Sequence, residues 1–191
     1  MIIETAPIFF STPKEFRNWL TMHGTTADFV WLGFYKKNSL MRSITYKEAL
    51  DEVLCFGWID GLVKKNDAQS YKQRFTPRRA KSVWSKVNTE HIERLTRLGK
   101  MTPSGLATVL SAKKDGRWER AYAPARSMEI PTDFINEIKK YPKAYGVFQT
   151  LNKTNLYAIS YKLATAAKTQ TKIKRTKDII DRLSRGELIH V

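Results

Sequence analysis

The segment from Trp58 to Asn88 contains the densest group of side chains suited to binding an anion. A planar arginine guanidinium grips a phosphate or carboxylate with two hydrogen bonds, and a flat aromatic ring stacks on a nucleobase or on the guanidinium itself. Both kinds of side chain are interleaved here beside one carboxylate. The candidate ligand-binding residues are Asp60, Arg74, Arg78, Arg79, Trp84 and Lys86. Their types predict a pocket for a phosphate-containing anion or a nucleotide.

Two other interpretations of the same segment are open. In one, Trp58, Phe75 and Trp84 are core residues, and Asp60 pairs with an arginine to fix the local chain. In the other, the protein is an enzyme acting on a small anionic substrate, with Asp60 as the acid or base and the arginines as the clamp. The residue types are compatible with a binding site, a core and an active site.

The remaining residues with reactive side chains form no recognisable constellation. His23, His91 and His190 are scattered, and none stands at a ligand spacing from another histidine or from Cys55. Cys55 lies between two apolar residues, as is typical of a buried core cysteine rather than a nucleophile. The glycines match neither a dinucleotide-binding fingerprint nor a P-loop. The sequence therefore predicts no metal and no cofactor.

The chain is strongly basic, with 34 Lys and Arg against 18 Asp and Glu in 191 residues, a formal net charge of +16. Residues 1–59 are neutral, whereas residues 60–100, 101–150 and 151–191 contribute +7, +3 and +6. This excess predicts an anionic partner, either a small molecule or a nucleic acid bound without sequence preference. In the C-terminal block, pairs four apart such as Lys174 with Asp178 also fit a solvated helix face laced with ion pairs.

Helix-start signals and apolar runs define the elements expected in the N-terminal part. Thr12 with Glu15 and Thr45 with Glu48 match the capping box that begins a helix. The apolar and aromatic run from Phe29 to Tyr35 is typical of a buried strand. In chain order, we expect a helix from Pro13 to Gly24, a strand within 28–37, a helix from Thr45 to Gly57, and a hairpin of strands 59–65 and 70–75.

The pattern after Pro77 is helical. The expected start and end signals are, in chain order, Asn88 or Thr89, Gly99, Thr102-Pro103, Asp115-Gly116, Thr154 and Gly186. The last helix is expected over about 171–185, with Ile173 among its inward residues. We therefore predict an α+β fold, a small antiparallel sheet with packed helices followed by a helical C-terminal domain. The expected organisation is an α+β domain over 1–120, a linker over 121–130 and a helical domain over 131–191.

Several features predict a cytoplasmic protein without a transmembrane segment. No stretch approaches the about 20 apolar residues that a membrane span requires. The first ten residues contain Glu4 and lack the basic start and long apolar run of a secretory signal. Cys55 is the single cysteine, which excludes an internal disulfide.

Several runs together resemble the YdeI/OmpD-associated family, also called bacteriocin-protection proteins. The matching runs are Thr45–Leu50, Cys55–Gly61, Arg74–Arg79, Trp84–Asn88 and Asp115–Trp118, with Leu151-Asn152 and Tyr157–Ile159 in the C-terminal part. The resemblance extends over nearly the whole chain and implies a small helical C-terminal domain. It also implies a link to survival of cationic antimicrobial peptides and to association with an outer-membrane porin, but no reaction, cofactor or catalytic residue. We expect a stress-protection protein that binds an anionic ligand through the basic and aromatic cluster.

Overall fold

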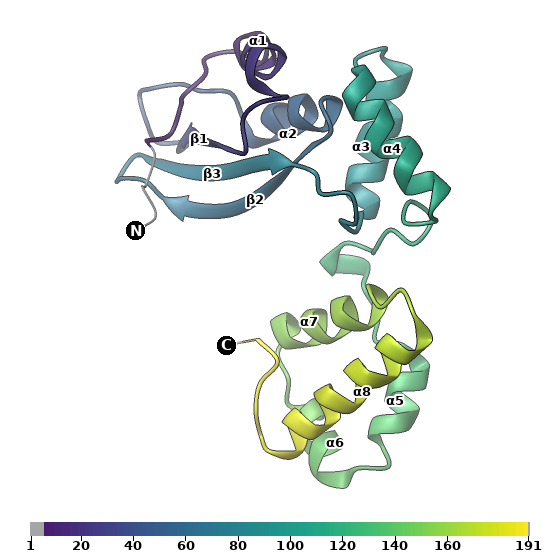
Figure 1. The fold of residues 1–191 in the computed structure, drawn as a ribbon. Coiled ribbons are helices and arrows are strands. Elements are labelled where there is room, and N and C mark those ends of the chain that lie inside the picture. The colour runs from purple at the N-terminus through teal and green to yellow at the C-terminus, as the bar shows by residue number, and fades with distance from the viewer. Residues whose placement is uncertain (1–5, 191) are drawn as a thin grey trace. The chain divides into compact units, whose positions relative to one another are not determined.

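The computed structural model describes residues 6–190, which form two compact units (Figure 1). The first unit contains residues up to Ser82 together with Asn88–Glu119, and the second contains Val83–Val87 and the residues from Arg120 onward. The first unit holds a three-stranded antiparallel sheet with helices, and the second is mainly helical. The predicted α+β fold class is therefore confirmed.

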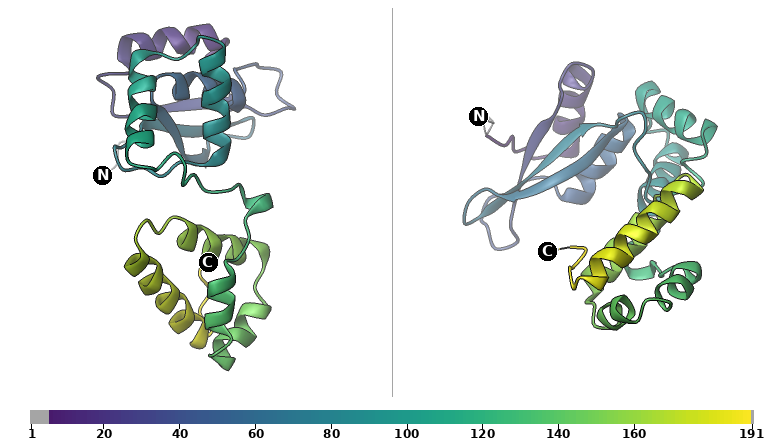
Figure 2. Two further views of the ribbon diagram at one scale, coloured as in Figure 1. Left: turned by 90° about the vertical axis from the view of Figure 1, so that its right-hand side faces the viewer. Right: turned by 60° about the horizontal axis from the view of Figure 1, so that its bottom comes forward.

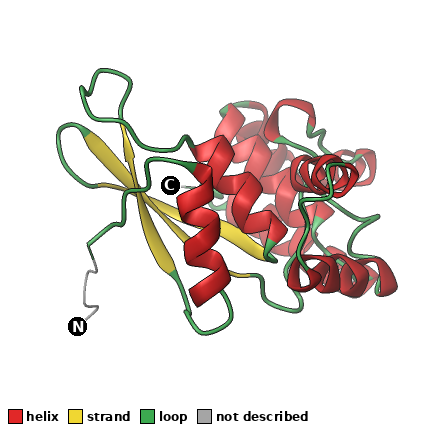
Figure 3. Ribbon diagram, turned by 90° about the horizontal axis from the view of Figure 1, so that it is seen from above, coloured by secondary structure: helices red, strands yellow, loops and turns green. Residues whose placement is uncertain are grey.

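The sheet of the first unit consists of β1 (Val30–Tyr35), β2 (Trp58–Lys65) and β3 (Ser70–Pro77), in the order β1-β3-β2. Helices α1 (Pro13–His23) and α2 (Tyr46–Cys55) lie over one face of this sheet, in front of the strands in Figure 3. Between the helices and the sheet lies an aromatic and aliphatic core, in which Phe75 of β3 packs against Phe16 of α1 and Phe34 of β1. Burial of these side chains stabilises the unit.

Both helices begin at the predicted N-cap threonines, and the reciprocal capping box forms at Thr45, whereas the Glu15 carboxylate accepts from the Ser11 N–H instead of the Thr12 N–H. The Thr12 hydroxyl accepts a hydrogen bond from the Glu15 backbone N–H at the start of α1. At the start of α2, the Thr45 hydroxyl accepts from the Glu48 N–H, and the Glu48 carboxylate accepts from the Thr45 N–H at 2.7 Å. These bonds satisfy backbone donors that the first helical turn leaves without partners.

The predicted hairpin between β2 and β3 is also present. Asp67 holds its turn: one carboxylate oxygen accepts from the backbone N–H groups of Gln69 and Ser70, both at 2.7 Å. The pairing of the two strands shifts register between Asp60 and Val63, so β2 carries an irregularity next to Gly61.

Helices α3 (Lys86–Arg97) and α4 (Pro103–Lys114), both teal in Figure 2, follow the sheet. The predicted Thr102 cap of α4 is confirmed, since its hydroxyl accepts from the Gly105 N–H. The predicted start of α3 at Asn88 or Thr89 is wrong, because both residues are buried in its first turn and the helix already begins at Lys86.

The second unit is built from α5 (Thr132–Ile138), α6 (Pro142–Gln149), α7 (Lys153–Ala164) and α8 (Thr169–Ser184), green to yellow in Figure 2. A short 3-10 turn, Ala125–Ser127, precedes them. Its core includes Phe134, Ile138, Ile159 and Leu183. Asn152, not Thr154, caps α7, because the Asn152 side chain accepts from the Asn155 N–H at 3.0 Å.

The last helix differs from expectation in its surface. Ile173 is 63% exposed rather than inward. None of the ion pairs expected four residues apart forms within α8; instead Lys172 reaches Asp133 of α5 at 2.6 Å and Arg185 reaches Glu187 at 2.7 Å. Asp133 belongs to another helix, whereas Arg185 is the C-cap of α8 and pairs with an acid two residues further along the chain.

Within residues 6–190, none of the helices combines the length and the apolar character that crossing a lipid bilayer requires.

Candidate functional site

Asp60 and Arg74, two of the predicted site residues, lie on opposite faces of the sheet. Asp60 is paired with Phe75 across the β2–β3 ladder, so its side chain lies on the helix-covered face. There its carboxylate accepts hydrogen bonds from Tyr46 Oη at 3.0 Å and Gln73 Nε2 at 3.4 Å. Arg74 is next to Phe75 in β3 and therefore lies on the other face. The arginine clamp around Asp60 that an enzyme would need does not include Arg74.

Trp84 and Lys86 belong to the second unit. Trp84 is 1% exposed, and Trp58 and Phe75 are equally buried, as the core interpretation of these aromatic residues predicts. The backbone around Trp84 pairs with Tyr122: the Tyr122 N–H donates to the Trp84 carbonyl, and the Lys86 N–H donates to the Tyr122 carbonyl, both at 2.9 Å. The Lys86 side chain is exposed.

Arg78 and Arg79, which follow β3 directly, do lie together. They line a pocket of about 270 Å³ in the first unit. The other residues that line it come from α4 and the turn after it or from the chain beside Arg79; they are Ala80, Ala107, Thr108, Ser111 and Arg117. We call this the arginine pocket. It brings three arginines, a serine and a threonine to one concave surface.

The wall formed by α4 is fixed by contacts with the end of α2. Both the backbone N–H and the hydroxyl of Thr102 donate to the Cys55 carbonyl, at 3.1 and 2.7 Å. Gly105 permits this approach, since a Cβ there would lie 2.0 Å from the Cys55 carbonyl oxygen. Gly57 has a φ of +76°, and a Cβ on it would lie 2.8 Å from Cγ2 of Thr108. The two glycines thus let α4 pack closely enough to bring Thr108 beside the end of β3.

The opposite wall begins at the end of β3. The Arg78 backbone N–H donates to the Gly57 carbonyl at 3.0 Å. Gly57 therefore lies next to Thr108 of α4 and also hydrogen-bonds to the backbone of Arg78. The Arg78 residue is 8% exposed, whereas Arg79 is exposed. Arg78 therefore lies at the base of the arginine pocket, and Arg79 extends toward solvent.

Arg117 is held in the pocket by three groups. Its Nε donates to both carboxylate oxygens of Asp115 at 2.8 Å, one terminal nitrogen donates to the Ser82 carbonyl at 3.1 Å, and the other to Ser111 Oγ at 3.2 Å. Its side chain is 13% exposed. Each terminal nitrogen of a guanidinium carries a second N–H, so these bonds orient Arg117 without using all of its donors.

Arginine guanidinium groups and neighbouring hydroxyls can together bind a phosphate or a carboxylate through hydrogen bonds. The sequence placed Arg78 and Arg79 in this role but missed Arg117, Thr108 and Ser111. The signal for Arg117 is the turn at Gly116, whose φ of +72° ends α4 and folds the next residue back toward the last helical turn. Thr108 and Ser111 carry no comparable signal, because helical hydroxyls are common on solvated faces.

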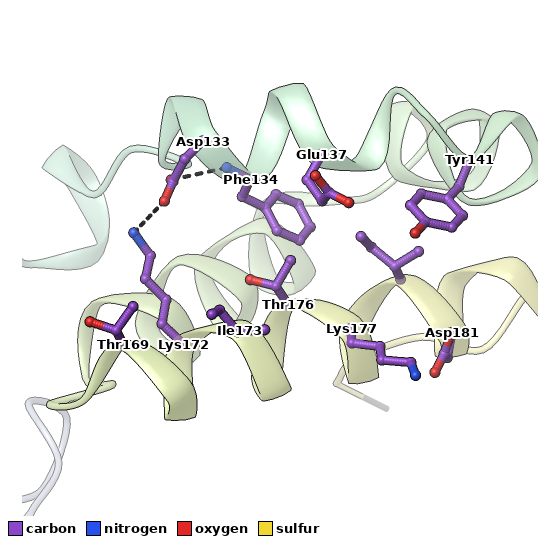
Figure 4. Close-up of a pocket in the computed structure, with 11 residues that line it drawn as sticks. Asp133, Phe134, Glu137, Tyr141, Thr169, Lys172, Ile173, Thr176, Lys177 and Asp181 are labelled. Atoms are coloured by element: carbon purple, nitrogen blue, oxygen red, sulfur yellow. Dashed lines mark hydrogen bonds and ion pairs between the residues drawn. The ribbon is translucent and has the colours of Figure 1, made fainter.

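A larger cavity of about 570 Å³ lies between α5 and α8 in the second unit (Figure 4). Phe134, Ile173 and Ile180 give it an apolar lining. Its charged groups have both signs and partly neutralise one another, since Lys172 donates to Asp133 at 2.6 Å. It therefore lacks the convergent single-sign charge of the arginine pocket.

Another groove, of about 520 Å³, lies between α3 and α4 and is also mainly apolar. Leu106, Val109, Leu110 and Trp118 line it together with Arg97 and other residues of α3. Its charged lining residues, Glu93, Arg97 and Lys113, have both signs, so it lacks the single-sign charge of the arginine pocket.

Among the described residues of the first unit, the titratable groups outside the pocket lie in the core or link neighbouring helices. Burial raises the pKa of the Cys55 thiol, which favours the neutral form and fits the predicted core role. Asp51 accepts hydrogen bonds from Arg94 and lies 2.7 Å from His91 Nδ1, which forms a link between α2 and α3. Within residues 6–190, no group of three or more His, Cys, Asp and Glu side chains could hold a metal ion.

Comparison with known proteins gives two family matches. Residues 8–108 match a family model described as a domain of unknown function (DUF8412). Residues 127–186 match the family described as Bacteriocin-protection, YdeI or OmpD-Associated. No curated protein and no solved structure matches the chain significantly.

The second match confirms the resemblance that the sequence indicated, over the C-terminal part of the chain. The matching runs between Thr45 and Asn88 lie in the segment covered by the other model. The first family match covers only part of the arginine pocket. Arg78, Arg79 and Thr108 lie inside it, whereas Ser111 and Arg117 lie between the two matched segments. Because residues 8–108 are more than half of its 191 residues, the chain belongs to the family described as a domain of unknown function (DUF8412), and its residues 127–186 are of the Bacteriocin-protection, YdeI or OmpD-Associated type.

Proposed function

We propose that this protein binds a small phosphate-containing anion in the arginine pocket. The observation that carries the proposal is the convergence of Arg78, Arg79 and Arg117 on one pocket with Ser111 and Thr108. Charge-assisted hydrogen bonds from guanidinium groups are about twice as strong as neutral ones, and paired N–H donors match the geometry of a phosphate.

Preorganisation supports phosphate over a loosely held counterion. Arg117 is oriented by Asp115, the Ser82 carbonyl and Ser111 before any ligand is present. The Arg78 main chain is fixed by its bond to Gly57, and the residue is 8% exposed. Because the Arg117 side chain needs little further ordering, less conformational entropy is lost when an anion binds.

The pocket also limits the size of the ligand. A volume of about 270 Å³ suits a phosphate or pyrophosphate group with a short organic portion, since drug-sized ligands occupy pockets of about 300–1,000 Å³. We propose a phosphomonoester or a diphosphate of a small metabolite as the ligand class, bound in the cytoplasm.

The biological role that we propose is stress protection of the kind named by the C-terminal family match. Loss of the gene should sensitise cells to bacteriocins or cationic antimicrobial peptides, and the wild-type gene should restore resistance. A gene carrying both Arg79→Ala and Arg117→Ala should fail to restore it if anion binding serves this role.

Isothermal titration calorimetry with inorganic phosphate, pyrophosphate and AMP tests the binding proposal. We expect saturable binding of at least one of them, weakened about tenfold or more by Arg79→Ala or Arg117→Ala, since a hydrogen bond to a charged group contributes about 1.5–3 kcal/mol. Lys177→Ala is the matched control, because it removes the same charge from an exposed position in the second unit. Equal losses in all three variants, or no binding of any probe, would contradict the proposal.

A further inference from the structure

The sheet face opposite α1 and α2 carries a row of aromatic and basic side chains. We call it the aromatic–basic face; its residues are Phe9, Phe29, Trp31, Tyr35, Lys64, Lys72 and Arg74. Along the chain around β1, Phe29, Trp31 and Tyr35 share this face because side chains alternate in a strand. Trp31 is paired with Arg74, and Lys64 with Lys72, so the cations of β2 and β3 lie on the same side.

The contacts within this face confirm that the residues lie together. The Arg74 guanidinium lies over the Phe29 ring, 4.4 Å from its centre. The ammonium groups of Lys64 and Lys72 lie 5.7 and 5.4 Å from the centre of a Trp31 ring. At the other end, Phe9 stacks on Tyr35 with 4.5 Å between ring centres, over Gly33, whose lack of a side chain leaves room for the Phe9 ring.

These side chains differ from those of the core on the other face. Phe29, Trp31, Tyr35 and Phe9 are only partly buried, whereas Phe34 and Phe75 on the helix-covered face are almost fully buried. The Arg74 Nε is buried and has no hydrogen-bond partner among residues 6–190. A partly exposed aromatic row with an unsatisfied arginine donor is costly for a surface with no ligand.

Charge and ring geometry together identify the class of ligand. Alternate side chains along a strand lie about 6.8 Å apart, so successive rings can each meet a separate base. Proteins that bind single-stranded nucleic acids combine such stacking rings with cations that follow the backbone phosphates. In a duplex the bases are stacked inside the helix and cannot stack on these rings, so a duplex would contact only the cations of this face.

We propose that the aromatic–basic face binds single-stranded nucleic acid, with Trp31 and Phe29 stacking on bases and Lys64 and Arg74 contacting phosphates, while the buried Lys72 supports the Trp31 ring from within the face. This surface is distinct from the arginine pocket, with which it shares no residue. Five of the basic residues between positions 60 and 100 thus belong to two separate sites.

Fluorescence anisotropy of labelled oligonucleotides with the full-length protein tests this proposal. We use a 12-residue oligothymidylate, the matching oligouridylate and a 12-base-pair duplex at low salt. We expect both single strands to bind more tightly than the duplex, and Trp31→Ala to weaken single-strand binding about tenfold, since the stacking of one base is lost. Trp31→Phe keeps an aromatic ring and should retain most of the affinity, and a normal circular dichroism spectrum shows that each variant is folded.

Charge controls separate this face from the rest of the basic surface. Arg74→Ala should weaken single-strand binding, whereas Arg79→Ala in the arginine pocket and Lys174→Ala on α8 should change it less than twofold. Tighter binding of the duplex, an unchanged affinity of folded Trp31→Ala, or equal losses in all three charge variants would overturn the proposal. Phosphate binding in the pocket is tested by separate variants, so either proposal can fail without the other.

Discussion

At the scale of single residues, Asp51 links α2 to the helix that follows the sheet. Its carboxylate accepts from Arg94 at 2.6 and 2.7 Å and lies 2.7 Å from His91 Nδ1. Burial alone would raise the pKa of Asp51, but the hydrogen bonds from Arg94 and His91 outweigh it and lower the pKa. The ionised carboxylate is therefore favoured in the folded state.

This lowered pKa predicts how stability depends on pH. The stabilisation from Asp51 is complete above the unfolded pKa of about 3.9 and is lost as the pH falls through the lower folded pKa. Asp51→Asn should lower the free energy of unfolding by about 1 kcal/mol at pH 7, since one set of charged hydrogen bonds is lost. The difference from wild type should shrink below pH 4.

Urea denaturation at pH 7, 5 and 3 measures this effect. Asp178→Asn is the control, because Asp178 is exposed on α8 and should show little change at any pH. A difference between wild type and Asp51→Asn that grows on acidification would be inconsistent with the direction of the pKa shift.

Residue types in the sequence predicted some members of the site but not their partners. Arg78 and Arg79 are adjacent in the chain, so their proximity could be predicted without knowing the fold. Asp60 and Arg74 seemed equally suited, yet strand alternation and the β2–β3 register place them on opposite faces. The Gly116 turn folds Arg117 back onto α4, but Arg117 meets Arg78 and Arg79 only because α4 packs on the end of α2, a tertiary contact that no local pattern indicates.

At the scale of elements, α4 is the wall on which the arginine pocket depends. Gly105 lies so close to the end of α2 that a Cβ would meet the Cys55 carbonyl oxygen at 2.0 Å, and backbone atoms cannot move aside cheaply. Gly105→Ala should therefore displace α4 and destabilise the protein by about 1–3 kcal/mol, the usual cost of overpacking.

Because α4 carries Thr108 and Ser111, the same substitution should also weaken pyrophosphate binding in calorimetry. Gly146→Ala in α6 is the matched control: a Cβ there meets no atom within 4 Å, so alanine should be neutral or stabilise the helix by up to about 1 kcal/mol. Equal thermal stability of the two variants would show that the approach of α4 to α2 is looser than the structure indicates.

The starts of helices could be predicted from the sequence where a side chain caps a backbone N–H close to it in the chain. Thr12, Thr45 and Thr102 each accept from a backbone N–H three residues ahead, and their helices begin as expected. The start of α3 was missed because backbone pairing of Ser85 with Tyr122, distant in sequence, precedes the helix. Ile173 was expected to be buried because helical periodicity places it on the apolar face of α8. Periodicity does not show whether another element packs on that part of the face, and Ile173 is exposed.

At the scale of the whole molecule, the two units have separate apolar cores. Leu54 is fully buried in the first unit and Leu183 in the second, which also has Ile159 and Phe134 in its core. The residues of the arginine pocket belong to the first unit alone. The site should therefore tolerate damage to the second core.

Leu183→Ala should destabilise the second unit by about 2–5 kcal/mol, the usual cost of a large cavity in a core. At a temperature where both units remain folded, it should leave pyrophosphate affinity within about twofold of wild type. Leu54→Ala in the first unit is the comparison, and it should lower affinity and stability together. Scanning calorimetry followed by titration measures both effects, and an affinity loss in Leu183→Ala as large as that in Leu54→Ala would contradict separate roles for the units.

Net charge predicted an anionic partner but not its location. Residues 60–100 carry +7, and the structure places five of their eleven Lys and Arg residues in the arginine pocket or the aromatic–basic face. The C-terminal +6 lies mainly on α8 and its flanks, where Lys172 and Arg185 pair with acidic residues. Charge arithmetic along a chain cannot separate two faces of one sheet, because alternate residues point in opposite directions.

The central claim is that the three arginines of the pocket bind a phosphate-like anion. The most direct measurement is the anomalous diffraction of crystals containing tungstate, a heavy-atom mimic of phosphate. We predict a peak within hydrogen-bonding distance of the Arg78, Arg79 and Arg117 side chains, which Arg117→Ala abolishes. Peaks confined to other surfaces, such as the aromatic–basic face or α8, would contradict the claim.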